Sequence, residues 1–286
     1  MNDVLLSVLL GVVEGLTEFL PVSSTAHLRI VEALVGVDLG DSYWKMFAIV
    51  IQLGAIACLP IYFRRRIGDF LRGLPGERGL LRHPLTLTAV AFVCTSVPSL
   101  LLVKMIGKHL ESLYVMGGAL VVGGVVMMVV DLMSGAGTVP TRTRRMEDMG
   151  LGQAVWIGLC QTLSAVFPGT SRSMATITAG QLAGMTRGAA LEFSFFLSMP
   201  TMLAATLYDL LKALRPGASV PLGEAVLMTP HAWALLAVGF VVSFVVAYLV
   251  VAWFMRWVRT HGLVPFAAYR LVAGAFVLLW MASRAT

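Results

Sequence analysis

The most polar stretch of the chain lies between strongly apolar segments and reads EGLTEFLPVSSTAH, from Glu14 to His27. Its two carboxylates, Glu14 and Glu18, are four residues apart, so a helix would present them on one face. Ionisable groups inside apolar segments are costly and usually serve a function or a partner. Two close carboxylates could bind a hard divalent cation, or one could bind the cation while the other handles a proton. The alternative is a structural pair, in which an arginine or a backbone amide satisfies each carboxylate.

After Pro21 the chain restarts as SSTAH. Ser23 or Ser24 is a natural N-cap for a second helix. Ser24 and His27 are three residues apart, so they share one face of that helix. A hydroxyl nucleophile needs a nearby base, and His27 or Glu18 could fill that role. Capping and packing are the simpler roles for a serine and a histidine on a helix, but the neighbouring glutamates favour chemistry.

A second polar stretch, FPGTSRSMAT, covers residues 167–176. Pro168 and Gly169 break the chain before a helix whose exposed N–H groups and positive dipole end favour an anion. Arg172 adds a planar, permanently charged fork that suits phosphate oxygens. Its alternative role is that of a structural partner for one of the two glutamates. Hydroxyl residues surround the helix start: Thr170, Ser171 and Ser173.

The two polar stretches are chemically complementary. One supplies acids, hydroxyls and a histidine, and the other supplies a cationic, amide-rich cradle for an anion. If the fold brings them together, they predict phosphoryl chemistry at membrane depth, where an arginine and a metal ion would stabilise charge. The substrate of such a site would need an apolar tail to reside there.

The rest of the chain is typical of a polytopic α-helical membrane protein. Of its 286 residues, 58% are hydrophobic and only 13% are charged, whereas a soluble domain is about a quarter charged. The N-terminus has no basic segment and no small-residue cleavage site, so we expect no signal peptide. Runs long enough to span a bilayer are predicted at 44–63, 86–107, 114–133, 189–211, 232–256 and 264–283.

Two further apolar regions, 3–36 and 151–184, break near the middle, and each half is too short to cross a bilayer alone. Each region is expected to form a re-entrant helical hairpin surrounded by protein, because broken backbone cannot face lipid. The two regions also resemble each other at an offset of 147 residues, which aligns the prolines at the two breaks and pairs Ser24 with Ser171. Chance similarity between two apolar helices is the alternative.

Charged residues predict the orientation. Arginines gather in the loops 64–82, 134–150 and 256–262, which lie on one side if each hairpin returns to its side of entry. The positive-inside rule makes this side cytoplasmic, which explains the net charge of +6 better than nucleic-acid binding does. Each half, 1–133 and 134–286, then has one hairpin and three crossings, so the second half is inverted relative to the first. The expected fold is therefore an all-α polytopic membrane protein with an inverted-topology repeat and both termini outside.

At the two polar stretches the sequence resembles the undecaprenyl-pyrophosphate phosphatase family, UppP, also called BacA. The family pattern is an E-x-x-x-E segment that runs into L-P-V-S-S-T-x-H, followed later by P-G-x-S-R-S-x-x-T, and this chain carries both patterns. The resemblance covers nearly the whole chain, including VIQLGAI at 50–56, EFSFFLSMP at 192–200 and PFAAYR at 265–270. It implies an integral membrane enzyme that hydrolyses undecaprenyl pyrophosphate to the monophosphate. Such enzymes recycle this lipid carrier for peptidoglycan synthesis and are linked to bacitracin resistance.

The resemblance also implies roles for single residues. Glu14 and Glu18 would be essential acids linked to a divalent cation, Mg2+ or Ca2+. Ser24 would be the nucleophile or a pyrophosphate contact, with His27 as an essential partner, and Arg172 would act in catalysis. Whether the Ser24 oxygen, a His27 nitrogen or a water attacks phosphorus stays open. Substrate contacts are expected from Arg172 and from Ser23, Thr25, Thr170, Ser171, Ser173, Thr176, Gln52 and Arg270, although Gln52 could equally be a polar residue used in helix packing.

Two other classes of protein compete with the enzyme. A transporter of lipids or organic anions would use the inverted repeat for alternating access, whereas a non-catalytic membrane scaffold would leave the polar clusters unexplained. The expected partners are the prenyl pyrophosphate, membrane lipid and a possible second copy in a homodimer. Gly117-Gly118 and Gly123-Gly124 permit close helix contact, which would serve packing within the chain as readily as a dimer. The resemblance favours a site that opens to the outer, periplasmic side of the bacterial inner membrane.

Overall fold

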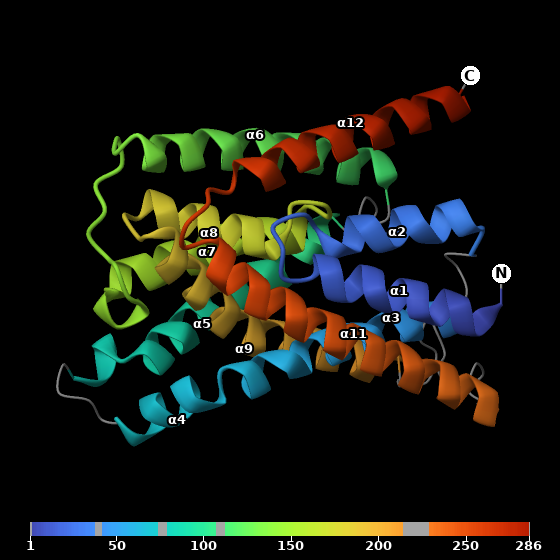
Figure 1. Ribbon diagram of the computed structural model, residues 1–286, viewed down its shortest axis with the longest axis horizontal. Helices are drawn as coiled ribbons and strands as arrows, with labels where there is room; N and C mark the ends of the chain where they lie inside the picture. Colours follow the sequence, from blue (N-terminus) through green and yellow to red (C-terminus); the bar gives the residue numbers. More distant parts are fainter. Residues whose placement is uncertain (1, 38–41, 74–78, 107–111, 214–228, 286) are drawn as a thin grey trace.

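The computed structural model describes residues 2–37, 42–73, 79–106, 112–213 and 229–285. These residues form helices that lie side by side, mostly along the long axis of the molecule (Figure 1). The α-helices are α1 (Asp3–Thr17), α2 (Ser24–Val35), α3 (Ser42–Tyr62), α4 (Arg64–Arg72), α5 (Pro84–Ile106), α6 (Leu113–Gly135), α7 (Leu151–Val166), α8 (Arg172–Leu182), α9 (Arg187–Ala213), α11 (Pro230–Trp257) and α12 (Val264–Ala285). Within the described residues there is no β-strand, only an isolated backbone bridge between Thr143 and Met185.

Six of these helices, α3, α5, α6, α9, α11 and α12, are long and apolar enough to cross a membrane. They lie at the six predicted spans, with ends that differ by a few residues. Their outward faces are apolar as well: Val272 and Leu279 on α12 are 71% and 72% exposed. Large aliphatic side chains would not line an aqueous surface in this density, so these faces are suited to lipid. The chain is therefore a multi-pass membrane protein, as the composition predicts.

The two regions that were predicted to break do so at the predicted prolines. The first forms α1 and α2, of 15 and 12 residues, and the second forms α7 and α8, of 16 and 11 residues. Each of these helices is too short to span a bilayer by itself. The turn between α1 and α2 contains Pro21, and the turn between α7 and α8 contains Pro168.

The first helix of each broken region packs against a long helix of the other half of the chain. Helix α1 lies along α11, and α7 lies along α5. Glycines allow the close approach: a Cβ at Gly11 would lie 2.9 Å from the carbonyl oxygen of Gly239, and a Cβ at Gly158 would lie 2.5 Å from that of Ala91. This exchange between the halves is what an inverted repeat would produce, but the repeat itself stays a prediction.

Helices α6 and α12 form the most extensive helix pair (Figure 1). Three of the four α6 glycines that were predicted to allow close helix contact, Gly117, Gly123 and Gly124, serve this pair within the chain. A Cβ at Gly117 would lie 3.0 Å from Leu278, and a Cβ at Gly124 would lie 3.1 Å from the carbonyl oxygen of Ala267. At Gly118 the neighbouring space is open. The homodimer stays a prediction.

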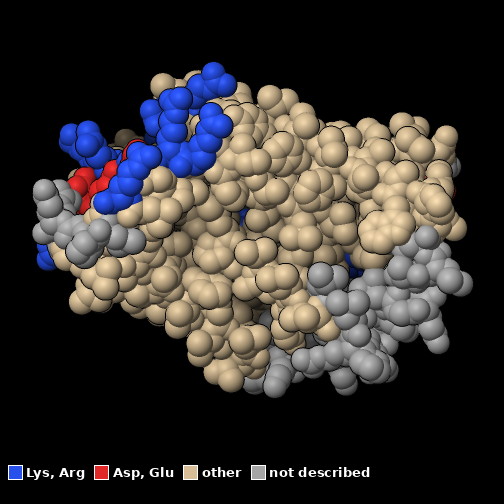
Figure 2. Space-filling view, turned by 90° about the horizontal axis from the view of Figure 1, so that it is seen from below, with Lys and Arg blue, Asp and Glu red and all other residues tan. Residues whose placement is uncertain are grey.

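Basic residues gather at one end of the molecule (Figure 2), the end at which α4 and the connection from α6 to α7 lie in Figure 1. Arg66, Arg145 and Arg259, one from each basic loop, line the same cavity there. The prediction that the three loops lie on one side is therefore confirmed.

Candidate active site

The turn between α1 and α2 lies against the turn between α7 and α8. The Ser173 hydroxyl donates a hydrogen bond to the carbonyl oxygen of Leu20 at 2.9 Å. The Arg172 Nη2 atom lies 3.3 Å from Glu18 Oε1, in a hydrogen-bonded ion pair. The fold thus brings the two polar stretches together, although 154 residues separate Glu18 from Arg172 in the chain.

The Arg270 side chain on α12 holds both turns. It is fully buried, at 0% exposed. Its Nη1 donates to the carbonyl oxygen of Pro21 at 3.2 Å, and its Nη2 donates to that of Gly169 at 3.1 Å. The Nη2 atom also donates to Ala119 of α6 at 3.0 Å. The guanidinium therefore positions the backbone of both turns, a role that the sequence did not indicate, and its contact with substrate stays a prediction.

Gly123 makes room for this guanidinium. A Cβ at Gly123 would clash with the Arg270 Nη2 atom, so the bare glycine on α6 leaves the space that the cation occupies. Gly169, in the second turn, has a φ of +93°, and a Cβ there would lie 2.6 Å from the carbonyl oxygen of Met116. Only glycine fits at both positions, because other groups of the site lie too close to the backbone there for a Cβ atom.

The Glu18 carboxylate forms hydrogen bonds with both Ser24 and Arg172. The Ser24 hydroxyl donates a hydrogen bond to Glu18 Oε2, and the other oxygen of the same carboxylate accepts from Arg172. All three side chains are largely withdrawn from solvent. A hydroxyl that donates directly to a buried carboxylate has a base within reach for its proton.

Glu14 lies one turn before Glu18, and the Glu18 backbone N–H donates to its carbonyl oxygen at 2.9 Å. Its side chain is 1% exposed, and its Oε1 atom has no hydrogen-bond partner among the described residues. An orphaned buried carboxylate oxygen beside a second carboxylate suits a hard cation. No group of three or more His, Cys, Asp or Glu side chains that could hold a metal ion occurs in the described part of the chain. A cation bound here would therefore depend on oxygens from the substrate or from water as well.

Both ring nitrogens of His27 form hydrogen bonds with groups other than Ser24 and Glu18. Its Nδ1 lies 2.7 Å from the carbonyl oxygen of Ser23, and its Nε2 lies 2.6 Å from the hydroxyl of Tyr269. A carbonyl only accepts, so Nδ1 carries a hydrogen and Nε2 of the neutral ring accepts from Tyr269. The two rings also stack, with centroids 5.5 Å apart. Tyr269 was not among the predicted site residues, although it belongs to the PFAAYR segment that contains Arg270.

The start of α8 forms the predicted cradle for an anion. Ser171 is its N-cap, and its hydroxyl accepts from the Met174 N–H at 3.3 Å. Arg172 follows, with its guanidinium carbon 5.9 Å from the centre of the Phe19 ring. Its Nε and Nη1 atoms are buried and have no hydrogen-bond partner among the described residues. A buried guanidinium with unused donors at a helix N-terminus is a site for an anionic group.

Two serines carry an unusual backbone conformation at the starts of α2 and α8. Ser23 has a φ of 74° and Ser171 a φ of 69°, and they are the non-glycine residues with positive φ in the described segments. Such conformations cost of order 1–3 kcal/mol and cluster at functional sites. Since both serines are N-caps, the structure pairs Ser171 with Ser23. The sequence alignment pairs it with Ser24 instead, because the second turn has one more residue after its proline.

The remaining predicted contacts lie in varied surroundings. The Thr176 hydroxyl is buried and lies 2.7 Å from that of Ser194 on α9. Thr25 is exposed, and Thr170 is half-buried. Gln52 Oε1 accepts from the Thr206 hydroxyl at 3.5 Å, a contact between α3 and α9. Direct binding of substrate by these residues stays a prediction.

Comparisons with known proteins point to one family. The family model described as "Bacitracin resistance protein BacA" matches residues 7–276. An undecaprenyl-diphosphatase of Koribacter versatilis is 64% identical over 293 residues, which cover 99% of this chain and 100% of the relative. Undecaprenyl-diphosphatases of Caldanaerobacter subterraneus subsp. tengcongensis and Sorangium cellulosum are 40% and 44% identical. These matches cover 96% of this chain in both cases, and 95% and 85% of the two relatives.

Proposed function

The chain belongs to the BacA family of bacitracin resistance proteins, and we propose that its two facing turns carry out its undecaprenyl-diphosphatase reaction. The enzyme is an integral membrane phosphatase that hydrolyses undecaprenyl pyrophosphate to undecaprenyl phosphate and phosphate. The observation that carries the proposal for the site is the buried Arg172 guanidinium, which has two unused donors and lies beside the Ser24–Glu18 pair. The transporter hypothesis has no comparable observation in its favour.

Arg172 is the group that we expect to hold the pyrophosphate. Its Nε and Nη1 atoms have hydrogen bonds to give, and the N–H groups at the start of α8 add further donors. Phosphoryl transfer involves little covalent chemistry by the protein, so positioning and charge stabilisation account for most of the acceleration. The low polarity around the Phe19 ring strengthens these electrostatic interactions.

Ser24 is the proposed nucleophile. Its oxygen forms a bond to the terminal phosphorus while the bond from that phosphorus to the bridging oxygen breaks. The hydroxyl proton passes to Glu18, and undecaprenyl phosphate leaves. A water then adds to the phosphoserine, the bond from phosphorus to the serine oxygen breaks, and Ser24 regains a proton as phosphate departs. The hydrogen bond from Ser24 to Glu18 supports this route over attack by His27, whose ring nitrogens lie on Ser23 and Tyr269.

Trapping the covalent intermediate tests this route. After rapid acid quenching of enzyme that is turning over substrate labelled in its terminal phosphate, label is expected on Ser24 and is expected to be absent from Ser24→Ala. We expect this variant to lose phosphate release by at least about a hundredfold, because the remaining route needs direct attack by water. A phosphohistidine loses its label in acid but keeps it in alkali, so a parallel quench in alkali checks His27. Label on His27, or full activity in Ser24→Ala, would contradict the assignment.

Glu14 and Glu18 are proposed to hold a divalent cation, Mg2+ or Ca2+. Magnesium is often bound through one or two carboxylates plus substrate phosphates, which suits a site with two glutamates and one orphaned oxygen. A cation bound there would supply positive charge to the phosphate oxygens. The residues of the chain itself orient the pyrophosphate and move the proton.

Removal and return of the metal tests this part. Dialysis against EDTA is expected to abolish phosphate release, and added Mg2+ or Ca2+ is expected to restore it. Glu14→Gln removes one ligand charge, so we expect it to raise the cation concentration needed for half-maximal recovery by roughly tenfold or more. Calorimetric titration of the apoprotein with the cation measures the same change without turnover. Activity that resists EDTA, with no heat of cation binding, would contradict a metal site.

We further propose that the protein lies in the inner membrane with its basic end in the cytoplasm. The gathering of arginines at one end of the molecule supports this orientation (Figure 2). The turns would then receive substrate from the periplasmic side, where the pyrophosphate form of the carrier is released. Recycling of the carrier there explains the link to bacitracin resistance that the family name carries.

A further inference from the structure

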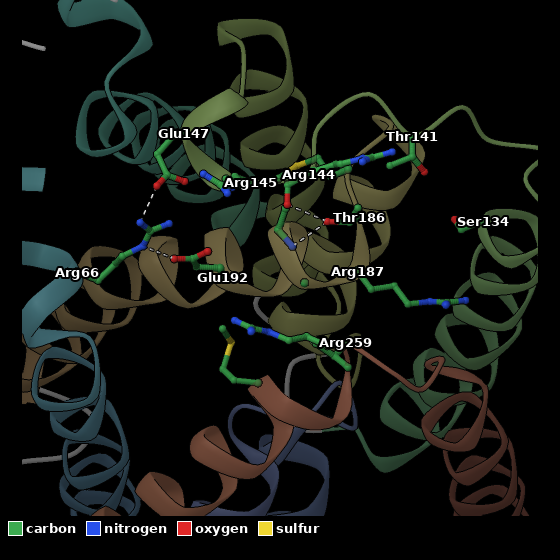
Figure 3. A pocket seen from close by; sticks show the side chains of 15 residues that line it. Arg66, Ser134, Thr141, Arg144, Arg145, Glu147, Thr186, Arg187, Glu192 and Arg259 are labelled. Atoms are coloured by element: carbon green, nitrogen blue, oxygen red, sulfur yellow. Dashed lines mark hydrogen bonds and ion pairs between the residues drawn. The ribbon is translucent and has the colours of Figure 1, made fainter. Parts of the chain in front are cut away.

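A cavity of about 540 Å3 lies at the basic end of the molecule, and we call it the basic pocket. It shares no lining residue with the two turns of the proposed active site. Its walls come from α4, the end of α6, the connection from α6 to α7, the start of α9 and the end of α11 (Figure 3). The volume is that of a small-molecule site. Its arginines are Arg66, Arg144, Arg145, Arg187 and Arg259.

The acidic residues of the basic pocket are already paired. Arg66 binds both of its glutamates, with Nη1 2.6 Å from Glu147 Oε1 and Nε 2.8 Å from Glu192 Oε1. Figure 3 shows these three side chains together on one side of the pocket. Another arginine of the pocket, Arg187, pairs with a carboxylate outside the lining, with its Nε 2.6 Å from Asp131 Oδ1. The carboxylates are thus engaged by these two arginines.

The other three arginines have no such partner. The side chains of Arg144, Arg145 and Arg259 are exposed and form no hydrogen bond or ion pair within the described ranges. Figure 3 shows Arg145 on one side of the pocket and Arg259 opposite, whereas the Arg144 side chain runs in the other direction, towards Thr141. Like charges that converge on a cavity repel each other in the absence of a counter-charge. The arrangement therefore favours an anion inside the basic pocket.

The start of α9 adds to this preference. Thr186 caps the helix, and its hydroxyl accepts from the Ala189 N–H at 3.3 Å. Gly188 lies in the first turn and lines the basic pocket, and the nearest atom that a Cβ there would meet is Cγ of Arg259, at 3.9 Å. Arg259 thus passes over the N-terminal end of a 27-residue helix. Backbone donors, the helix dipole and an arginine fork act together on an anion at this point.

Orientation in the membrane alone does not explain these features. The positive-inside rule needs basic residues in loops, but it does not require them to converge from separate elements on a hollow. Arg256 lies in the last turn of α11, three residues before Arg259, and it satisfies that rule without lining the pocket. Its Nε donates to the carbonyl oxygen of Ala252. Basic pockets between helix ends at a membrane surface are suited to phosphate head groups.

We propose that the basic pocket binds a phosphate group, carried either by an anionic phospholipid at the membrane surface or by a free phosphate ion. Arg145 and Arg259 contact the phosphate oxygens from opposite sides, and the start of α9 donates to them. Met255 and Val258 belong to the apolar part of the wall, together with Met185 and Ala189, and the glycerol end of a lipid would lie there. This site is independent of the proposed phosphatase mechanism, because it uses none of the same residues.

Binding measurements on the full chain in a non-ionic detergent test the proposal. The probes are dioctanoyl phosphatidylglycerol, inorganic phosphate and, as a zwitterionic control, dioctanoyl phosphatidylcholine. The Arg172→Ala background prevents the active site from contributing its own phosphate binding, and the same titrations in the otherwise unaltered protein check that background. Arg145→Gln/Arg259→Gln is compared with the matched control Arg256→Gln, and the thermal unfolding midpoint of each variant verifies folding.

We expect the double variant to bind the anionic probe at least about tenfold more weakly and Arg256→Gln to bind it within about twofold of the parent. Binding of phosphatidylglycerol without binding of inorganic phosphate would identify a lipid head-group site, and arginine-dependent binding of inorganic phosphate would identify a free-phosphate site. Equal affinity in the double variant and its parent would overturn the proposal. So would an equal loss in Arg256→Gln, or the absence of binding for both phosphatidylglycerol and phosphate.

Discussion

Replacing Arg172 with alanine is expected to lower kcat for undecaprenyl pyrophosphate by roughly a thousandfold, the scale seen when an arginine that stabilises a phosphoryl transition state is removed. The variant loses the unused donors at Nε and Nη1, and it leaves Glu18 without its ion-pair partner. Arg172→Lys keeps the charge but loses the planar fork, so we expect it to recover only part of the rate. Phosphate release by the purified protein, measured at saturating substrate, provides the readout.

Glu18→Gln tests the carboxylate that pairs with Arg172 and accepts the Ser24 hydroxyl proton. Glutamine keeps the shape of the side chain but accepts a proton poorly, so the Ser24 hydroxyl loses its base and kcat is expected to fall by at least about a hundredfold. Since Arg172 and Glu18 act together, the double variant is expected to lose much less than the product of the two single effects. Independent, multiplicative losses would show that the two residues serve separate steps.

Arg72→Gln is the control for both changes. Arg72 lies at the end of α4 and also pairs with a carboxylate, with its Nη1 4.0 Å from Asp69 Oδ1. It is an i,i+3 pair along α4 whose side chains are 85% and 66% exposed, and exposed pairs of this kind contribute little. We therefore expect activity within about threefold of the parent. Phosphate release that is unaltered in Arg172→Ala and in Glu18→Gln would rule out the site as described.

Arg270→Met is expected to destabilise the protein by roughly 2–5 kcal/mol, because three buried carbonyl oxygens lose their charged donor. Methionine fills much of the space, so the effect reports mainly on the hydrogen bonds. The loss should appear as a lower midpoint of thermal unfolding in detergent, followed by fluorescence. Activity is expected to fall as well, since the turns with Pro21 and Gly169 would no longer share one anchor.

Arg284→Gln on the same helix provides the comparison for Arg270→Met. The Arg284 guanidinium carbon lies 4.5 Å from the centre of the Trp280 ring near the chain end, in an exposed setting. Its replacement is expected to leave the midpoint almost unchanged. If Arg270→Met instead kept the parental midpoint and raised only KM, then Arg270 would be a substrate contact, as the resemblance predicted, rather than an anchor for the turns.

The sequence by itself determined the elements and the chemistry that they carry. Apolar runs of bilayer length located the six long helices, because each run must satisfy its own backbone hydrogen bonds in lipid. Pro21 and Pro168 located the two breaks, because proline cannot continue a helix. The spacing of Glu14 and Glu18, and the hydroxyls after each proline, identified the polar stretches before their surroundings were known. These features are local, so neighbouring residues suffice to predict them.

Only the tertiary structure decided which groups meet. The Arg172–Glu18 ion pair and the hydrogen bonds of Arg270 to both turns join segments more than 100 residues apart, and no local pattern encodes such contacts. The same holds for Tyr269 on His27, which the sequence missed, and for the convergence of arginines on the basic pocket. Packing of α1 on α11 and of α7 on α5 fixes how the turns face each other. The residue types thus follow from sequence, whereas their partners follow from how helices pack across the chain.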